Sequence, residues 1–262
     1  MPHPTRTILI TGGTRGLGLA TAELFAKSGY ALILTYRSDH ENADKVRRYF
    51  ELSGVSCHTV ACDFSEEGAP EKLSTMIGEI TGSLSVYVHN AAATAFRPLL
   101  DIKPHHIQKT FNITVASFIQ NVQWIVPMMP SGGAIVTVSG MDTHEAVPHH
   151  GLLASAKATL EMLTVYFAHE LATKKIRVNG VNPGYLETDS TRKYFGPRFD
   201  QVSAFVGSLT PSRERARLED VASVIEFLAS ERATWVVGQT IVVDGGQNFS
   251  SPASLALEVD KT

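Results

Sequence analysis

Apolar runs of strand length alternate with amphipathic stretches of helix length along the whole chain. The expected strands are Thr7–Ile10, Ala31–Tyr36, Ser56–Cys62, Leu84–His89, Ala134–Val138, Ile176–Val181 and Thr240–Val243. The expected helices are about Gly16–Ser28, Asp39–Leu52, Ala69–Thr81, a long region ending near Met129, Leu152–Thr173 and Glu219–Ser230. Because the strands are almost continuously apolar, both of their faces must be covered. The pattern therefore predicts an α/β fold with a parallel sheet between two layers of helices.

No linker, internal repeat or low-complexity segment divides the chain, and 262 residues are enough for one large α/β domain. We expect this single domain to span residues 1–249. A long irregular insertion over residues 185–216 follows the sixth strand and is expected to form a lid. Residues 250–262 form a polar tail, which we expect to be loose.

Composition argues against several classes of partner. A net charge of −3 gives no reason to expect nucleic acid or an anionic membrane as a partner, and no apolar stretch is long enough to cross a bilayer. The N-terminus leads directly into the first strand without the apolar core of a signal peptide. Cys57 and Cys62 lie five residues apart in one expected strand, where a disulfide is not expected. These features favour the cytoplasm.

A glycine-rich run joins the first expected strand to the first expected helix. Such a run lets the backbone turn tightly and approach a pyrophosphate, whose charge then rests on the helix N-terminus. The alternative is a tight turn without a ligand, but its place between the first strand and helix favours a dinucleotide site. The residues expected to contact the dinucleotide here are Gly12, Thr14, Arg15, Gly16, Leu17 and Gly18.

The end of the second expected strand bears on the choice of dinucleotide. An acidic residue there would bond the ribose diol, whereas this chain has Arg37 and Ser38, with Asp39 too far along to replace the acid. An arginine beside a hydroxyl suits a 2′-phosphate, and Arg15 adds a second positive charge. We therefore expect NADP(H) rather than NAD(H); the alternative is that Arg37 is only a solvated surface charge.

Further short motifs follow the expected strands and helices in order. They are Asp63-Phe64, Asn90-Ala91-Ala92, Asn112, Val138-Ser139-Gly140, Ser155-Ala156-Lys157, the run Val178–Gly184, Thr188, Gly238-Gln239 and Asp244-Gly245-Gly246. With the glycine run, they make residues 5–249 resemble the short-chain dehydrogenase/reductase superfamily. The resemblance implies a Rossmann-type doubly wound parallel sheet, an oxidoreductase activity and a homodimer or homotetramer.

The resemblance also implies roles for individual residues. Asp63 with Phe64 would contact the adenine, and Asn90 with Ala91 and Ala92 the neighbouring ribose region. Lys157 would hold the nicotinamide ribose. The residues implied to contact the nicotinamide amide are Pro183, Gly184, Leu186 and Thr188.

The chain departs from the family at the proton donor. Members usually carry a tyrosine four residues before the lysine, because the ammonium lowers the pKa of its phenol. Here that position holds Leu153. His150, seven residues before Lys157, lies within about 20° of the same helix face. This spacing resembles the enoyl-thioester reductases of the superfamily, which place a tyrosine there, and an imidazole can donate a proton near neutral pH.

Alternatives remain open for this donor. His149 is a second candidate, and the loop histidines His144, His149 and His150 are otherwise simply solvated. No carboxylate or cysteine completes a metal shell with them, so no metal is expected. Tyr185 and Tyr194, in the insertion, are either substitute donors or residues that pack the lid.

Two further residues complete the expected catalytic set. Ser139 would bond the substrate carbonyl, although a shift of one residue in the loop would put Gly140 at that place. Asn112 would support a chain of water molecules to Lys157, or else form a hydrogen bond between helices. Apolar residues on the long helices are expected in the core or at an oligomer interface: Phe118, Trp124, Leu160 and Phe167.

These expectations predict an NADPH-dependent reductase of an activated C=C bond in a small-molecule or carrier-bound substrate. The substrate would be an enoyl thioester or a conjugated carbonyl of fatty-acid-like or secondary metabolism. Conjugate reduction tolerates the loss of tyrosine, because the enolate is stabilised by delocalisation and is protonated by His150 or water. The rivals are a ketoreductase or alcohol dehydrogenase with a relocated donor, and a non-redox or regulatory nucleotide-binding protein.

Overall fold

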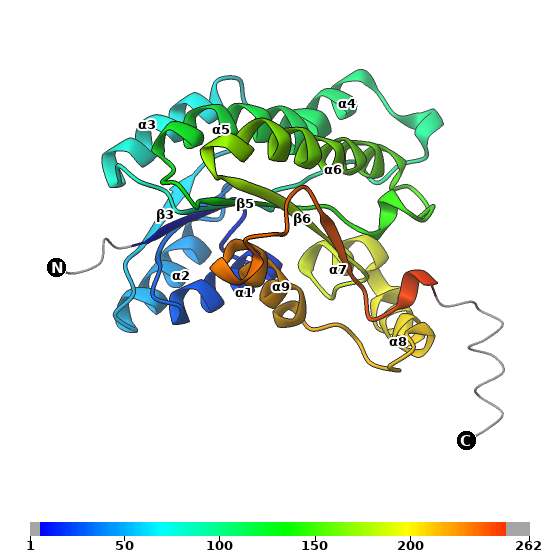
Figure 1. The fold of residues 1–262 in the computed structure, drawn as a ribbon. Coiled ribbons are helices and arrows are strands. Elements are labelled where there is room, and N and C mark those ends of the chain that lie inside the picture. The colour runs from blue at the N-terminus through cyan, green and yellow to red at the C-terminus, as the bar shows by residue number, and fades with distance from the viewer. Residues whose placement is uncertain (1–5, 250–262) are drawn as a thin grey trace.

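The computed structural model describes residues 6–249 and has a parallel sheet at its centre (Figure 1). The sheet has the order β3-β2-β1-β4-β5-β6-β7, with every pairing parallel. Its strands are β1 (Thr7–Ile10), β2 (Ala31–Tyr36), β3 (Cys57–Ala61), β4 (Val86–His89), β5 (Ala134–Val138), β6 (Arg177–Pro183) and β7 (Thr240–Val243). The predicted α/β class, with a Rossmann-type doubly wound sheet in one domain, is confirmed.

Helices cover both faces of the sheet (Figure 1). One layer contains α1 (Gly16–Lys27), α2 (His40–Leu52) and α9 (Leu218–Ala229). The other contains α3 (Ala69–Ile80), α4 (Pro104–Phe111), α5 (Ser117–Ile125) and α6 (Gly151–Leu171). The sheet thus has an apolar core on each side, one around Phe25 and one around Phe118, and both rings are almost completely buried. Burial on both faces explains the continuous apolar strands.

The long helical region expected to end near Met129 is present and consists of several consecutive helical elements. A short 3-10 helix η1 (Leu99–Asp101) precedes α4, the π-helical turn η2 (Asn112–Ala116) separates α4 from α5, and a 3-10 helix η3 (Val126–Met128) ends the region. Pro104 begins α4, where the missing proline N–H leaves no helical hydrogen bond unmade.

The expected irregular insertion contains two helices, α7 (Asp189–Phe195) and α8 (Phe199–Leu209), joined by the 3-10 helix η6 (Gly196–Arg198). The prediction of an irregular segment was therefore wrong for these residues. Thr188 caps α7, accepting a hydrogen bond at 3.2 Å from the backbone of Thr191. The four remaining short elements are η4 (Met141–Thr143), η5 (Ala172–Lys174), η7 (Glu231–Ala233) and η8 (Gln247–Phe249). The expected loose tail lies outside the described residues.

Within residues 6–249, no helix combines the length and apolar character needed to cross a bilayer. Both cysteines are free thiols. Burial raises the pKa of Cys57 and of Cys62 to about 12, so neither is a reactive thiolate near neutral pH.

Candidate functional site at the carboxyl edge of the sheet

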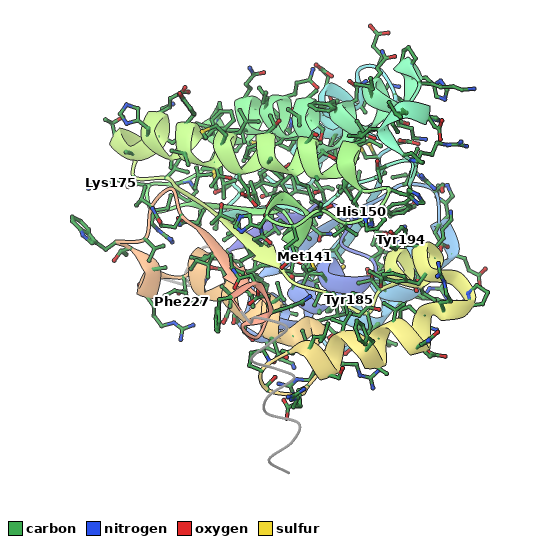
Figure 2. The ribbon with its side chains drawn as sticks, turned by 90° about the vertical axis from the view of Figure 1, so that its right-hand side faces the viewer. Met141, His150, Lys175, Tyr185, Tyr194 and Phe227 are labelled. Carbon is green, nitrogen blue, oxygen red and sulfur yellow. The ribbon has the colours of Figure 1, made fainter. Side chains whose placement is uncertain are left out.

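The loops that follow the parallel strands all emerge at the same edge of the sheet. β1 lies between β2 and β4, so the chain runs away from β1 in opposite directions on its two sides. Such a reversal opens a crevice at the carboxyl ends of the strands, which is where α/β proteins bind ligands. Figure 2 shows His150, Tyr185 and Tyr194 together at this edge, away from Lys175.

The glycine loop between β1 and α1 requires glycine for two different reasons. Gly12 and Gly16 have φ angles of +64° and +52°, which L-residues with side chains seldom adopt. Gly18 has an ordinary backbone, but a Cβ there would lie 2.3 Å from the carbonyl oxygen of Gly12. Arg15, at the N-cap of α1, makes no side-chain capping bond. The helix therefore begins without a side-chain cap, an arrangement suited to an anion.

Asn90 ties the end of β4 to this loop. Its side-chain amide donates to the carbonyl oxygens of Thr11 at 3.0 Å and Gly12 at 3.2 Å. The backbone N–H groups of Asn90 and Ala91 both donate to the Thr11 hydroxyl at 3.0 Å. Asn90 therefore shapes the glycine loop from behind, and the exposed Ala92 follows it at the crevice.

The ends of β2 and β3 place a positive charge beside a carboxylate. Arg37 and Ser38 are exposed, whereas Phe64 is buried. Asp63 accepts hydrogen bonds from the backbone N–H of Ser65 at 2.9 Å and from its hydroxyl at 2.7 Å. Burial alone would raise the pKa of Asp63, but these bonds and the positive charge of Arg37 outweigh it and lower that pKa. The edge can thus hold an anion at Arg37 and an N–H donor at Asp63.

The chain after β6 returns to the glycine loop. A Cβ on Gly184 would lie 2.6 Å from the Cβ of Asp244, so a side chain does not fit there. Leu186 is buried, and Thr188 begins α7. The Cγ2 atom of Thr188 lies 3.8 Å from the point where a Gly16 Cβ would be. These residues therefore close the crevice from the side opposite Asn90.

Lys157 projects from α6 into the loop after β5. Its ammonium donates to the carbonyl oxygen of Ser139 at 2.6 Å. Burial lowers the pKa of Lys157, partly offset by the carboxylates of Asp142 and Glu161. The lysine is therefore held in place by the backbone and by two negative charges.

The residue that faces Lys157 is Gly140. The hydroxyl of Ser139 instead donates to the carbonyl oxygen of Val181 at 3.2 Å and is buried against β6. A Cβ on Gly140 would lie 3.0 Å from the Lys157 ammonium nitrogen and 3.0 Å from Oδ1 of Asp142. The geometry thus favours the shift of one residue in the loop. This shift places Gly140, which has no side chain, where the Ser139 hydroxyl was expected.

His150 forms a buried pair with Asp142. Its Nδ1 lies 3.2 Å from Oδ2 of Asp142, and the two side chains are 18% and 6% exposed. The other ring nitrogen, Nε2, is buried without a hydrogen-bond partner among the described residues. The ring centroids of Phe96 and Tyr194 lie 4.9 and 4.6 Å from the centroid of the His150 imidazole. Burial would raise the pKa of Asp142, but the bond from His150 and the positive charge of Lys157 outweigh it and lower that pKa.

The hydroxyls of both candidate substitute tyrosines form hydrogen bonds. The Tyr194 hydroxyl donates to the carbonyl oxygen of Pro148 at 2.6 Å, and burial raises its pKa. The Tyr185 hydroxyl lies 2.7 Å from that of Ser203 in α8. The Tyr194 hydroxyl therefore holds the insertion against the loop before α6, and the Tyr185 hydroxyl holds two parts of the insertion together.

Asn112 begins the π-helical turn, in which the N–H of Ser117 bonds to the Asn112 carbonyl. A hydrogen bond from the sheet supports this turn, because His89 Nε2 lies 3.0 Å from the carbonyl oxygen of Thr114. A carbonyl can only accept, so Nε2 donates and Nδ1 accepts from the Tyr87 hydroxyl at 2.8 Å. Burial lowers the pKa of His89 to about 4, which keeps the ring neutral. π-turns of this kind are frequent at functional sites.

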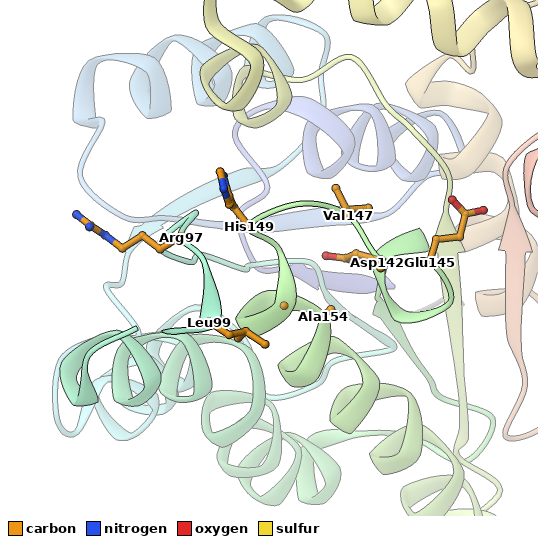
Figure 3. A pocket seen from close by; sticks show the side chains of 9 residues that line it. Arg97, Leu99, Asp142, Glu145, Val147, His149 and Ala154 are labelled. Carbon is orange, nitrogen blue, oxygen red and sulfur yellow. The ribbon is translucent and has the colours of Figure 1, made fainter. Parts of the chain in front are cut away.

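A cavity of about 250 Å³ lies next to Asp142 (Figure 3). The side chains of Arg97 and Leu99 line one part of it, and the loop from Asp142 to His149 lines another. His149 is exposed and has a φ of +63°, a strained conformation for a residue with a side chain. Such strain gathers at functional sites.

Sequence reasoning missed Asp142 and Phe96. Phe96 lies in a loop and Asp142 in the short 3-10 helix η4, where no periodicity relates one side chain to another. Asp142 could have been identified from the sequence as an acidic residue close to the histidines of the same segment. No group of three or more histidine, cysteine, aspartate or glutamate side chains within residues 6–249 is arranged to hold a metal ion.

A family model described as enoyl-(acyl carrier protein) reductase matches residues 12–248. The chain is 30% identical over 261 residues to 1-cyclohexenylcarbonyl-CoA reductase of Streptomyces collinus, covering 97% of this chain and 93% of that protein.

Several solved structures share this fold at more than 25% identity, and two of them contain NADP. The angucycline C-6 ketoreductase LanV with bound NADP is 28% identical, with a TM-score of 0.84, over 94% of this chain and 96% of that one. A short chain dehydrogenase from Burkholderia cenocepacia J2315 in complex with NADP is 27% identical, with a TM-score of 0.84, over 93% of this chain and 98% of that one.

Proposed function

The chain belongs to the enoyl-(acyl carrier protein) reductase family of the short-chain dehydrogenases/reductases, and from this premise we propose that it is an NADPH-dependent reductase of an activated C=C bond. The proposed substrate is an enoyl thioester or a conjugated carbonyl compound, free or on a carrier. The proposed domain spans residues 1–249, with residues 185–216 as a lid.

NADP(H) fits the crevice described above. The uncapped start of α1 suits the pyrophosphate, and Arg37 with Ser38 suits the 2′-phosphate. Asp63 would receive the adenine amino group. The buried ammonium of Lys157 would bond the nicotinamide ribose. When bound, the reduced cofactor supplies a hydride and is left as NADP⁺. Two similar proteins of solved structure carry NADP, which supports this assignment.

The catalytic residues support conjugate reduction over ketone reduction. Leu153 and Gly140 offer no hydroxyl to a carbonyl oxygen beside Lys157. A ketone would need a proton donor at that oxygen as the hydride arrives. In conjugate reduction the hydride goes to the β-carbon, and the enolate then takes one proton at the α-carbon. The substrate gains two hydrogens and two electrons, and one NADPH is oxidised.

The single observation that carries the proposal is the way in which the His150 side chain is held. One ring nitrogen is bonded to Asp142, while Nε2 is buried and has no partner among the described residues. A solvated loop histidine would not be held in this way. We assign Nε2 as the proton donor to the α-carbon, with Lys157 positioning the cofactor and Asn112 supporting the lysine. The similarity to a reductase named for a cyclohexenylcarbonyl thioester supports this substrate class.

A matched panel of substrates tests the proposal. NADPH oxidation is followed with crotonyl-CoA, with cyclohexenone and with the saturated ketone cyclohexanone. We expect turnover of the first two and none of the third. Turnover of cyclohexanone alone would overturn the proposal in favour of a ketoreductase. The similarity to the ketoreductase LanV is the reason for testing this activity. NADPH binding without any turnover would favour the non-redox rival.

Replacing the proposed donor separates His150 from solvent as the proton source. His150→Phe should lower kcat about 100-fold, at the lower end of the range for a general acid. His105→Phe, an exposed histidine on α4, is the matched control and should leave kcat unchanged. If His150→Phe retained the wild-type kcat at every pH, the donor would be water.

We also propose that the enzyme is a homo-oligomer. The side chains of Met162, Val165 and Tyr166 lie on α6 and are 57%, 47% and 62% exposed, an apolar surface that a second copy would cover. Phe118 and Leu160 are core residues, whereas Trp124 and Phe167 are half-buried. Light scattering should give at least twice the mass of one chain, and a monomeric mass would contradict this assembly.

A further inference from the structure

We propose that Asp142 is a positioning residue that fixes the imidazole of His150 with its hydrogen on Nδ1, so that Nε2 is the atom that carries the catalytic proton. This inference rests on the proposed function, because it names the residue that makes His150 a donor. Asp142 itself does not touch the reacting atoms.

The hydrogen bond between the two side chains sets the tautomer. Asp142 is ionised near neutral pH, because its pKa lies below the usual range for a carboxyl group. An ionised carboxylate only accepts hydrogen bonds, so the contact of 3.2 Å requires a hydrogen on Nδ1 of His150. The neutral ring then has its lone pair on Nε2, and the protonated ring has a second N–H there. The same logic fixes the imidazole in the serine-protease triad.

The absence of a side chain at Gly140 makes this arrangement possible. A Cβ on Gly140 would lie 3.0 Å from Oδ1 of Asp142, too close for a side chain without rearrangement. Through Oδ2 the same carboxylate reaches His150, and its charge also acts on Lys157. One carboxylate therefore serves two groups: the lysine that would hold the cofactor and the histidine that would deliver the proton.

Two aromatic rings also contact the imidazole of His150. Phe96 comes from the loop after β4 and Tyr194 from α7, with ring centroids 4.9 and 4.6 Å from that of His150. These contacts leave 18% of the side chain exposed. A ring fixed by one hydrogen bond and two aromatic neighbours loses little further freedom when the substrate binds.

Several charged or titratable groups bear on this pair from the neighbouring elements. Asp142 faces Lys157 of α6, and Lys157 also interacts with Glu161 one turn further along that helix. Tyr194 of α7 contacts His150. The groups that line the adjacent cavity with Asp142 are Arg97, Glu145 and His149. Among them, only Asp142 accepts a hydrogen bond from His150.

The tautomer can be measured without turnover. Nitrogen-15 NMR of the labelled full-length protein reports which ring nitrogen of each histidine carries the hydrogen, and His150→Phe assigns the His150 signals by their disappearance. We expect hydrogen on Nδ1 in the wild type and in Asp142→Glu, which keeps a carboxylate. In Asp142→Asn the amide can donate to Nδ1, so the hydrogen should move to Nε2. An unchanged tautomer in Asp142→Asn would overturn the inference.

Kinetics give the second readout. With crotonyl-CoA and NADPH, Asp142→Asn should lower kcat more than 10-fold and change KM less than twofold, and Asp142→Glu should restore part of kcat. Glu170→Gln, an exposed residue at the far end of α6, is the control and should match the wild type. An Asp142→Asn enzyme with the wild-type kcat would contradict the inference.

The two readouts distinguish this inference from the proposed function. If the tautomer changes in Asp142→Asn but no conjugated substrate is turned over, the positioning role stands and the proposed reaction fails. If conjugated substrates are turned over and the tautomer does not change, the reaction stands and the role of Asp142 fails. Thermal unfolding of each variant shows whether it is folded before either readout is interpreted.

Discussion

The two sides of the carboxyl edge are built in different ways. Around β1 and β4, the backbone forms the site: Gly12 and Gly18 have conformations or contacts that exclude a side chain, and Asn90 holds the loop through its amide. Around β5 and α6, side chains form the site: Asp142 in η4 and His150 at the N-cap of α6 stand next to the lysine.

This difference explains why one side keeps the family pattern and the other departs from it. A backbone site depends on several residues at once, because each supports the position of the next. A side-chain site can change its chemistry by exchanging residues without moving the main chain. Leu153 and Gly140 remove two hydroxyl positions beside Lys157 while the helix and strand that carry them persist.

The largest effect is expected from Lys157, which would bond the cofactor. Lys157→Met removes a buried ammonium that bonds the Ser139 carbonyl and faces Asp142. We expect kcat/KM to fall about 100- to 1000-fold, as for the loss of one positioned donor. Steady-state kinetics with crotonyl-CoA measure this loss. The control is Lys174→Met, an exposed residue of η5. Equal losses in both variants would show that the loss does not come from the position of Lys157 in the site.

A smaller but still large effect is expected on the backbone side. In Gly18→Ala the new Cβ would lie 2.3 Å from the Gly12 carbonyl oxygen, so the glycine loop must move. The free energy of unfolding should fall by about 1–3 kcal/mol, the usual cost of overpacking, and NADPH affinity should fall with it. Denaturant unfolding and calorimetry measure the two quantities.

Gly78→Ala is the matched control, because Gly78 is exposed in α3 and a Cβ there meets nothing within 4 Å. Alanine is favoured over glycine in a helix by about 1 kcal/mol, so this variant should be slightly more stable than the wild type. If Gly18→Ala had the same free energy of unfolding as Gly78→Ala and bound NADPH normally, the conclusion that the backbone forms the site around β1 and β4 would be wrong.

The smallest effect is expected from Arg37, a side chain at the edge of the site that the backbone forms. Arg37→Ala should weaken NADPH binding about 10-fold and leave NADH binding unchanged, because a charge-assisted bond to the 2′-phosphate is lost. Calorimetry with both cofactors measures the difference. Arg48→Ala is the control, since Arg48 pairs with Asp44 on the surface of α2 at 2.8 Å. An equal change for NADPH and NADH would make Arg37 a solvated charge with no part in selection.

The sheet could be predicted from sequence because its strands are short, apolar and regularly spaced. The strand Thr240–Val243 was predicted with its observed bounds, and the strand at Cys57–Ala61 differs by one residue at each end. The lid helices were missed because α7 is short and begins at a threonine cap rather than in an apolar period. The π-turn at Asn112 was missed because its support, the bond from His89, comes from a different element.

The catalytic side could be predicted only where helix geometry applies. The spacing of His150 and Lys157 follows from the helical period, so the sequence alone singles out His150 as a candidate. The choice between Ser139 and Gly140 depends on the path of the loop after β5, and the sequence pattern does not determine that path. The pair of Asp142 and His150 spans a loop without periodicity, and only the folded backbone brings the two together.

The fate of the hydride tests the central claim most directly. The enzyme is given cyclohexenone and NADPH that carries deuterium at the transferred position, in ordinary water, and the product is examined by proton and deuterium NMR. Our account predicts saturated cyclohexanone with deuterium on the β-carbon and a solvent hydrogen on the α-carbon. Deuterium on the carbon that bears a hydroxyl group, in an allylic alcohol product, would contradict it.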